Sequence, residues 1–564
     1  MLWYLTRCTP ACHEFMKTHV FIYPGGEIPE SPSSSTSFSV LPGRVPDAAA
    51  ALAGELADPA LETVVFWDTR CGQLPWDSIG RFERSLDDVW HAGISGAGGA
   101  DLLSHAAPLA VYRPDPRADL DGGINWKLDL RATLIRARVL RAVGSLDPTY
   151  ETLSGAAREL GYRLLRRGAV CRQQPNLVTE PPLLEPRPLA DDYRLLRQYF
   201  NSKWTAYTLA RRLMRGGAWG AEVAAWRHSA NVGPRTKVPT GALLRDVSGV
   251  WPPARPSVSV ILPTFGRYRY VAEVLDDLRA QTIKPTQILI ADGNAVEDRQ
   301  PEVYENYRDL PIEILWHTET GICSGRNACL QKVTGDHVWF VDDDSRIGPD
   351  NLEAHFRVMQ AYGADVSVGP AYTKSRPELH GDQREVMCTH MDCGTTLCTA
   401  SLLRQVGGFD MEFNQYLAGE DGELGIRFVR AGGLMVNNPF AQRFHYVAPV
   451  GGSRTSKRSV HRFTRWSLVP RPVQSIYYTA KRYYEPHTAL DAMVQGSVLA
   501  GWRRREGVPA TRAWKMKTLL GELAAVPVTI VRLYRSVQAG RDMVEQGPMI
   551  PELARHADAR SVTR

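Results

Sequence analysis

The stretch Val338-Trp339-Phe340-Val341-Asp342-Asp343-Asp344 decides how this sequence is interpreted. Four apolar residues in a row predict a buried strand. Three carboxylates follow at once, and because like charges repel, stability alone does not explain them. Ligands of α/β sheets bind beyond the carboxyl ends of strands, and Mg²⁺ or Mn²⁺ takes oxygen ligands that it shares with phosphates. The Asp-x-Asp therefore indicates a metal–phosphate site, with an acidic turn as the alternative.

The segments around this stretch alternate between two periodicities. Residues 258–262, 287–291 and 312–316 are predicted strands, and residues 270–281 and 324–333 are predicted helices. Alternating strands and helices are typical of βαβ units and a mostly parallel sheet. The fold class predicted from this pattern is α/β.

Length and charge suggest several domains and a basic tail. A chain of 564 residues is too long for one domain, so two to four are expected. From Tyr446 to Arg564 there are 20 Lys and Arg against 8 Asp and Glu, a net charge of +12 within a total of +6. The tail therefore favours an anionic surface or polymer as a neighbour, although a solvated basic tail is equally ordinary.

The cysteines and the apolar runs bear on the compartment. The 9 cysteines are odd in number and scattered, which favours a reducing compartment. Residues 1–7 do not resemble a secretory signal, and no run approaches the roughly 18 apolar residues of a membrane span. We expect a cytoplasmic protein that rests on the inner face of the cell membrane.

The order of motifs between residues 256 and 449 resembles the family 2 glycosyltransferases, inverting enzymes of GT-A fold that use nucleotide sugars. The segments that carry the resemblance are 257–267, 288–294, Gly325-Arg326-Asn327, Asp342-Asp343-Asp344, 406–410 and 419–427. Each motif alone is weak, but their order and spacing together are specific. The resemblance covers about a third of the chain.

The resemblance implies roles for individual residues. The nucleotide sugar would be bound by Pro263, Thr264, Phe265, Arg267, Asp292, Arg326, Asn327, Asp342 and Asp343. The metal, Mg²⁺ or Mn²⁺, would be bound by Asp342, Asp344 and His445. Asp292 departs from the usual Asp-Asp-Gly-Ser pattern of the family, so the atom that it contacts is open. A structural role for His445 is the alternative to ligation.

Glycosyl transfer needs two groups that this sequence contains. The leaving diphosphate must be stabilised, which a metal and Arg326 can do. The acceptor hydroxyl must lose a proton, for which Asp421 is the candidate general base. Glu420 beside it would orient the sugar or cap the helix that follows. The alternative for both carboxylates is an acidic helix N-terminus, where negative charge is favourable anyway.

An internal repeat precedes this region. Residues 64–70 parallel residues 338–344, with Asp68, Thr69 and Arg70 where the three aspartates stand. Residues 140–147 parallel 403–410, and alanines occupy 156 and 157, which correspond to Glu420 and Asp421. We therefore predict a degenerate GT-A-like half over residues 61–180 that has lost the chemistry.

The remaining segments complete the predicted organisation. Residues 1–60 form an N-terminal segment, partly loop; 181–255 a helical linker; 256–450 the catalytic domain; and 451–564 a helical basic region. The helices of the last region would contact a membrane or pack on the catalytic domain. No nucleic-acid-binding fold accompanies the basic residues.

Two other functions stay open at this point. A nucleotidyltransferase on a similar sheet would need the Asp-x-Asp but not Asp421, and a non-catalytic sugar- or nucleotide-binding scaffold would need neither. The sequence does not identify the sugar, so a UDP-sugar is the default donor. The acceptor would be a glycan, a lipid-linked glycan or a peptide.

Overall fold

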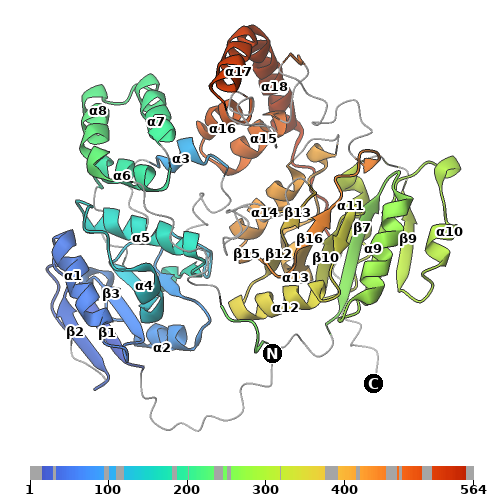
Figure 1. The fold of residues 1–564 in the computed structure, drawn as a ribbon. Helices are drawn as coiled ribbons and strands as arrows, with labels where there is room; N and C mark the ends of the chain where they lie inside the picture. Colours follow the sequence, from blue (N-terminus) through green and yellow to red (C-terminus); the bar gives the residue numbers. More distant parts are fainter. Residues whose placement is uncertain are drawn as a thin grey trace. The chain divides into compact units, whose positions relative to one another are not determined.

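The computed structural model describes residues 16–29, 34–94, 101–109, 120–180, 187–200, 202–233, 245–250, 256–317, 319, 321–374, 391–414, 419–452, 466–468, 473–497 and 511–553. The chain forms two compact units (Figure 1). The first comprises residues 1–102 and 117–244, and the second comprises residues 103–116 and 245–564. Each unit is built on a β-sheet of its own.

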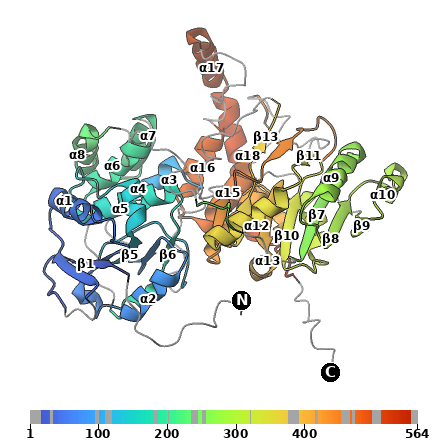
Figure 2. The same ribbon diagram turned by 60° about the horizontal axis from the view of Figure 1, so that its bottom comes forward.

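The first unit contains a six-stranded sheet in the order β2-β1-β3-β5-β4-β6. The strands are β1 (Thr18–Ile22), β2 (Thr36–Val40), β3 (Thr63–Trp67), β4 (Val89–His91), β5 (Ala132–Arg136) and β6 (Cys171–Gln173). The helices are α1 (Val45–Leu56), α2 (Trp76–Arg84), α4 (Ala137–Val143), α5 (Leu153–Arg167), α6 (Leu189–Tyr199), α7 (Ser202–Met214) and α8 (Trp219–His228). Successive side chains of β3 point to opposite faces of the sheet, so they belong to two different cores. Val64 and Phe66 pack in the core with α4 and α5, whereas Val65 and Trp67 pack in the core with α2. These helices lie on opposite faces of the sheet (Figure 2).

The second unit contains a seven-stranded sheet in the order β15-β12-β14-β10-β7-β8-β9. Its strands are β7 (Val258–Thr264), β8 (Gln287–Asp292), β9 (Ile312–Trp316), β10 (His337–Val341), β12 (Val366–Val368), β14 (Thr395–Thr399) and β15 (Met435–Asn437). A small sheet joins β11 (Ser345–Ile347), β16 (Arg443–His445) and β13 (Ala371–Tyr372). The predicted α/β class and the strand before the carboxylates are confirmed.

Helices cover the second sheet and form the tail. Those of the sheet domain are α9 (Tyr268–Ala280), α10 (Glu302–Glu305), α11 (Ile322–Leu330), α12 (Asn351–Tyr362), α13 (Ala400–Val406) and α14 (Glu420–Arg430). The tail consists of α15 (Val473–Tyr483), α16 (Thr488–Ser497), α17 (Arg512–Ala524) and α18 (Val526–Gln546), and α16 contacts the inserted helix α3 (Leu103–Ala106). Among the helices whose placement is described, none is both long and apolar enough to cross a bilayer.

The two sheets repeat one topology. Six strands follow the order β6-β4-β5-β3-β1-β2 in the first unit and β15-β12-β14-β10-β7-β8 in the second. The pairings along both orders are parallel, antiparallel, antiparallel, parallel and parallel. β3 and β10 occupy the same place, and each ends immediately before an aspartate, Asp68 or Asp342. The repeat inferred from short sequence matches is therefore a repeat of the whole sheet.

A buried arginine makes the same contacts in both copies. In the first unit, the Arg163 guanidinium donates to the carbonyls of Val143, Gly144 and Ser145 and to Glu159. In the second, the guanidinium of Arg427 donates to the carbonyls of residues 406, 407 and 408 and to the carboxylate of residue 423. Each arginine thus fastens the long helix α5 or α14 to the loop after α4 or α13.

A tyrosine extends the same network to the next helix. Tyr199 at the end of α6 donates to Glu159 at 2.6 Å, and Tyr483 at the end of α15 donates to Glu423. The repeat therefore reaches from the first strand to the first helix after each sheet. It begins at Thr18, so the boundary predicted at residue 61 falls inside the first sheet. The short strands β1 and β2 lie far from β3 in sequence, and β1 pairs in parallel with both β2 and β3.

We predict that Arg163→Met and Arg427→Met each lower the free energy of unfolding of their unit by about 3–5 kcal/mol, because a buried carboxylate loses its partner. Denaturant titration measures the change. Arg44→Met is the control, since Arg44 is 82% exposed and 3.8 Å from its partner Asp47, and should change stability by less than about 0.5 kcal/mol. A cost below about 1 kcal/mol for both buried arginines would contradict this account.

Candidate active site

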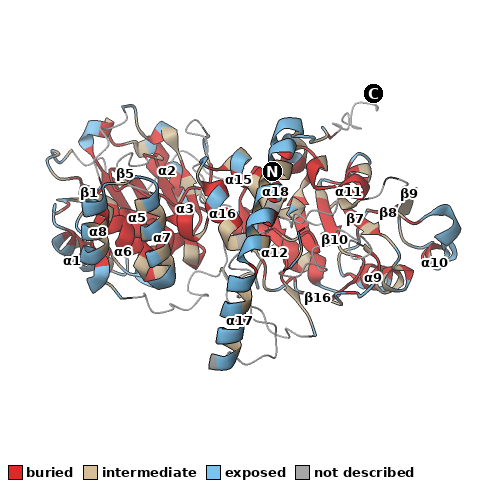
Figure 3. Ribbon diagram, turned by 90° about the horizontal axis from the view of Figure 1, so that it is seen from above, coloured by how far each residue is buried: buried red, intermediate tan, exposed pale blue. Residues whose placement is uncertain are grey.

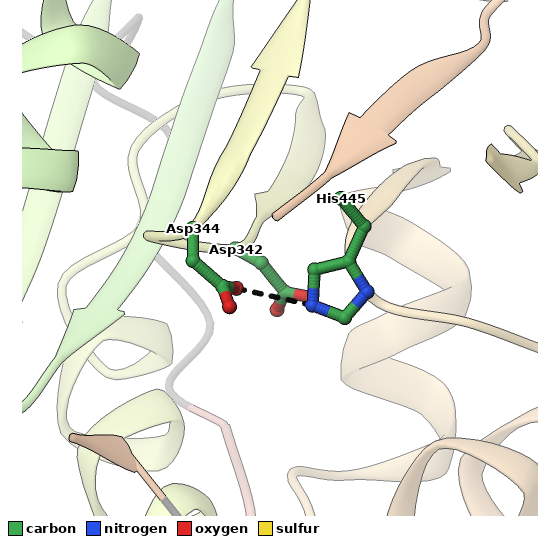
Figure 4. A group of neighbouring side chains, drawn as sticks. All are labelled: Asp342, Asp344 and His445. Carbon is green, nitrogen blue, oxygen red and sulfur yellow. Dashed lines mark ion pairs between the residues drawn. The ribbon is translucent and has the colours of Figure 1, made fainter. Parts of the chain in front are cut away.

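Three carboxylates follow the end of β10, and the middle one points away from the other two. Asp342 and Asp344 face a common space together with His445, and the donor atoms of these three side chains lie within 4.8 Å of one another (Figure 4). His445 arrives there because β16 pairs with β11 in a register that sets Ser345 opposite His445. The Tyr446 amide also donates to the Asp344 carbonyl at 2.9 Å, which fixes the end of β16 against the carboxylates.

Asp344 is held as an anion by its neighbours. His445 Nε2 lies 3.2 Å from Asp344 Oδ1, and the Ala448 amide donates to Oδ2 at 2.9 Å. Burial acts to raise the pKa of Asp344, but the hydrogen bond and charge of His445, with Arg267 and the Ala448 amide, hold it well below the ordinary value. A carboxylate that stays ionised at low pH is suited to binding a cation.

Asp343 turns away from this space and ties β10 to the loop after β7. Thr264 Oγ1 donates to it at 2.9 Å and Arg267 donates to it at 2.7 Å. Burial raises the pKa of Asp343 to about 6, although Arg267 acts in the opposite direction. Asp343 thus positions Arg267, whose guanidinium also lies 3.4 Å from Asp344.

Arg326 on α11 links the Asp-x-Asp to α14. Its guanidinium donates to Asp421 at 2.7 Å and lies 3.6 Å from Asp342 and 3.7 Å from Glu420. The guanidinium carbon also lies 5.0 Å from the centre of the Phe409 ring. Arg326 Nε is buried and has no hydrogen-bond partner within the described part of the chain. One buried cation therefore faces three carboxylates from two elements and retains an unused donor.

The two carboxylates of α14 differ in their environment. Gly419 precedes them with φ 119°, a left-handed conformation that lets the chain turn sharply into the helix. Asp421 accepts from the Cys393 amide at 3.1 Å as well as from Arg326, and Glu420 accepts from the Gly419 amide at 3.1 Å. Burial and the charge of Asp421 raise the pKa of Glu420 to about 7, with Arg326 opposing. Near neutral pH the pair therefore carries a proton that can exchange.

Sequence reasoning missed Arg443 and Asp392. Arg443 donates to Asp342 at 2.9 Å and to both oxygens of Asp392 at 2.9 Å. A Cβ at Gly394 would lie 1.8 Å from the guanidinium carbon of Arg443, so glycine is required there. A signal for Arg443 was available in the sequence: residues 443 and 445 are two positions apart on a strand, so their side chains lie on the same face.

Within the chain, Asp292 binds two tyrosines and an asparagine. Its carboxylate is fully buried and accepts from Tyr268 and Tyr304 on one oxygen and from the amide and side chain of Asn294 on the other. These four hydrogen bonds hold α9, α10 and the end of β8 together. Contact between Asp292 and a nucleotide base stays a prediction.

The other expected binding residues line the neighbouring loop and helix. Pro263 and Phe265 are half-buried at the end of β7. The Asn327 side chain donates to the Phe409 carbonyl at 2.8 Å and accepts from the Phe409 amide at 2.7 Å. Asn327 therefore positions the ring against which Arg326 packs, and its contact with a nucleotide sugar stays a prediction.

The segment after α18 returns to the back of the site. The Gly408 amide donates to the Pro551 carbonyl and the Met411 amide to the Met549 carbonyl, both at 2.9 Å. The Gln331 side chain at the end of α11 donates to the Glu552 carbonyl at 2.8 Å. Residues 547–553 therefore brace the loop that carries Phe409 and the helix that carries Arg326.

We predict that truncation after Gln546 speeds amide hydrogen exchange at Gly408 and Met411, because both amides lose their acceptors. Exchange measured by NMR or mass spectrometry reports the change directly. Truncation after Leu553 keeps both acceptors and serves as the control. Unchanged protection of both amides after the shorter truncation would show that the returning segment does not brace this loop.

A sequence model of one family matches part of the chain. The model of glycosyl transferase family 2 matches residues 259–415. The match includes the loop after β7, Arg326 and the three aspartates, and ends before Glu420, Asp421 and His445. Most of the seven-stranded sheet and the Asp-x-Asp therefore lie within the matched region, whereas β15 and the carboxylates of α14 lie outside it.

Curated relatives also resemble part of this chain. Glycosyltransferase GlyA of Streptococcus pneumoniae serotype 4 is 28% identical over 123 residues, 22% of this chain and 18% of the relative. The poly(ribitol-phosphate) β-N-acetylglucosaminyltransferase TarS of Staphylococcus aureus is 28% identical over 112 residues, 19% of this chain and 20% of the relative. The chain thus matches about a fifth of the length of these relatives.

Two solved structures have lower identity. Residues 1–349 of S. aureus TarS are 17% identical, with 51% of this chain and 90% of that chain covered at a TM-score of 0.35. The mannosyltransferase PcManGT of Pyrobaculum calidifontis, solved with GDP-Man and Mn²⁺, is 16% identical, with 54% and 91% covered at a TM-score of 0.35. Residues 259–415 are therefore similar to glycosyl transferase family 2, and the curated relatives are glycosyltransferases.

Proposed function

We propose that the second unit is an inverting glycosyltransferase that moves a sugar from a nucleoside-diphosphate sugar to an acceptor hydroxyl. The observation that carries the proposal is the position of Arg326, which lies between Asp342 of the Asp-x-Asp and Asp421 of α14. Donor-side and acceptor-side carboxylates thus adjoin one cation. Transfer requires this proximity, because the leaving group and the base act on opposite sides of one carbon atom.

The donor side stabilises the leaving diphosphate. The buried guanidinium of Arg326 has a free Nε donor that can bind a phosphate oxygen, and hydrogen bonds to a charged group in a buried site are strong. Arg267 at the loop after β7 supplies a second cation beside Asp344. Both guanidinium groups are fixed by carboxylates before substrate arrives, so little reorganisation is needed as charge develops.

Asp342, Asp344 and His445 fit a Mg²⁺ or Mn²⁺ ion. Their donor atoms lie within 4.8 Å of one another, and two carboxylates with one imidazole make a donor set of the kind that Mn²⁺ accepts. When bound, the ion supplies Lewis-acid stabilisation of the diphosphate. Arg443 and Arg326 hold Asp342 in place for this role.

Asp421 acts as the general base. The acceptor hydroxyl gives its proton to the Asp421 carboxylate while its oxygen bonds to the anomeric carbon. The bond from that carbon to the phosphate oxygen breaks with its electron pair, and the nucleoside diphosphate leaves. A single displacement of this kind inverts the anomeric configuration. Glu420, whose pKa is raised to about 7, adjoins the base and orients the sugar.

The partners and the location follow from the same features. A UDP-sugar is the default donor, and the acceptor is a glycan, a lipid-linked glycan or a peptide. The six cysteines of the described part are free and buried, which supports a cytoplasmic location. The basic residues after Tyr446 support contact with the inner face of the cell membrane.

The first unit is proposed to be structural or to position the acceptor. Arg70, at the place of Asp344, donates to both oxygens of Asp68 at 2.7–3.0 Å. Ala156 and Ala157, at the places of Glu420 and Asp421, are fully buried among apolar side chains. A guanidinium thus replaces the metal, and the base is absent.

We predict that Asp344→Ala abolishes metal-dependent binding of the donor nucleotide, because the cation loses a carboxylate ligand. Asp421→Asn should keep nucleotide binding and lower transfer by about 10²–10⁴-fold, because it removes the base. Calorimetric titration of UDP with and without Mn²⁺, followed by a transfer assay, separates the two effects. Asp298→Asn on the exposed loop after β8 is the control and should change neither. Full transfer activity in Asp421→Asn would show that Asp421 is not the general base.

We predict a pH signature for Glu420. Its pKa is raised from 4.5 to about 7 in the folded chain, so the folded state binds more protons than the unfolded state between these values. Wild-type stability therefore loses this contribution as pH rises through that window. Glu420→Gln lacks the loss, so its stability relative to wild type should increase between about pH 5 and about pH 8. Denaturation at both pH values measures this difference, and a flat or falling difference would contradict the raised pKa.

A further inference from the structure

The helical tail of the second unit carries an apolar surface that the proposed reaction does not use. On α17, the side chains of Met516, Leu519, Leu520 and Leu523 are exposed, and Leu520 and Leu523 are 59% and 58% exposed. Their spacing of three and four residues sets them along one side of the helix. Much of α17 is exposed (Figure 3). The buried Thr518 lies on the other side. A surface helix of a globular protein normally turns its apolar side to the core, and α17 has the reverse arrangement.

The surface continues on α18. Val526, Ile530 and Tyr534 recur every four residues and are exposed, with Ile530 at 61%. Another side of α18 is already packed, because Ser536 and Gly540 are buried and a Cβ at Gly540 would lie 2.7 Å from the Tyr477 ring of α15. The exposed residues of the apolar stripe, residues 516–534, therefore lie beside the side of α18 that packs on α15.

Basic residues flank the stripe. Between Arg512 and Arg535 the sequence contains four cations besides the buried Arg532, namely Arg512, Lys515, Lys517 and Arg535, and one acidic residue, Glu522. On α17, Lys515 and Lys517 stand at positions on either side of the exposed leucines. Apolar side chains bordered by Lys and Arg suit the interface of a bilayer with anionic headgroups, where each cation near the surface adds about 1 kcal/mol.

We propose that α17 and the first half of α18 lie in the interface of an anionic lipid bilayer, with the stripe among the acyl chains and the lysines at the headgroups. The charge pattern favours lipid over a second copy of this chain, since the same net positive charge on two copies would repel. The inference deepens the proposed location at the membrane and does not depend on the chemistry at Asp421.

Vesicle sedimentation with the full chain tests the proposal. Wild type should bind vesicles that contain phosphatidylglycerol and bind pure phosphatidylcholine at least about tenfold less. Leu520→Ser with Leu523→Ser should weaken binding to the anionic vesicles by about tenfold or more, and Lys515→Gln with Lys517→Gln should weaken it and reduce its salt dependence. Met214→Ser is the matched control, because Met214 is 68% exposed on α7, outside the stripe.

Two outcomes would overturn the proposal. One is equal binding of wild type and the leucine variant to anionic vesicles. The other is a wild-type oligomer in size-exclusion chromatography that the leucine variant dissociates, without vesicle binding by either, which would assign the stripe to self-association. Nucleotide binding and donor hydrolysis by both stripe variants should equal those of wild type, so failure of the membrane proposal and failure of the proposed reaction are distinguishable.

Discussion

The buried guanidinium of Arg326 is the constraint on which the site depends. Removing a cation from water costs several kcal/mol unless nearby carboxylates offset that cost. Carboxylate oxygens of Asp421, Asp342 and Glu420 all lie within 3.7 Å of the Arg326 guanidinium. Phe409 packs on the guanidinium, and Asn327 fixes Phe409 through its backbone. Because these groups come from the end of β10, from α11 and from the start of α14, one cation links these three elements.

The duplication separates what the fold needs from what the chemistry needs. Both copies keep the buried arginine on the long helix, Arg163 or Arg427, with the same carbonyl and carboxylate acceptors. In both copies, an aspartate shortly before the antiparallel strand, β5 or β14, is paired with a guanidinium. In the second unit Arg443 reaches Asp392 across Gly394, whereas in the first unit Arg131 donates to Asp129 at 2.8 Å. The interactions that both copies retain belong to the scaffold.

The two copies differ at the end of one strand and at the start of one helix. After β3, Asp68 and Arg70 stand where the second copy has its Asp-x-Asp, and they form a salt bridge with each other. In α5, two alanines are buried in the core where α14 has its carboxylates. A protein that no longer binds a metal must still neutralise the carboxylate after the strand, and Arg70 does so. The second copy keeps its carboxylates beside Arg326, whose buried Nε has no hydrogen-bond partner in the described part of the chain. Burying such a donor costs stability, and the first copy does not have this arrangement at the corresponding positions.

Sequence reasoning succeeded where the chemistry is local and failed where it depends on tertiary register. The four apolar residues of β10 and the carboxylates after them are contiguous, so their strand and its end could be predicted. Arg443 meets Asp342 only through the pairing of β16 with β11, and Asp292 is enclosed by Tyr268 and Tyr304 from two separate helices. The spacing of Arg443 and His445 sets both on one face of a strand but does not identify Asp342 as the partner, because the register of short strands is set by packing.

The most direct test of the central claim is nucleotide release from a panel of UDP-, GDP- and dTDP-sugars by the purified chain with Mn²⁺. The account predicts slow release from one donor and loss of that release in Arg326→Met, while denaturation shows that the variant stays folded. If no donor releases nucleotide and none binds in a titration with Mn²⁺, the arrangement around Arg326 does not serve glycosyl transfer, and the account is contradicted.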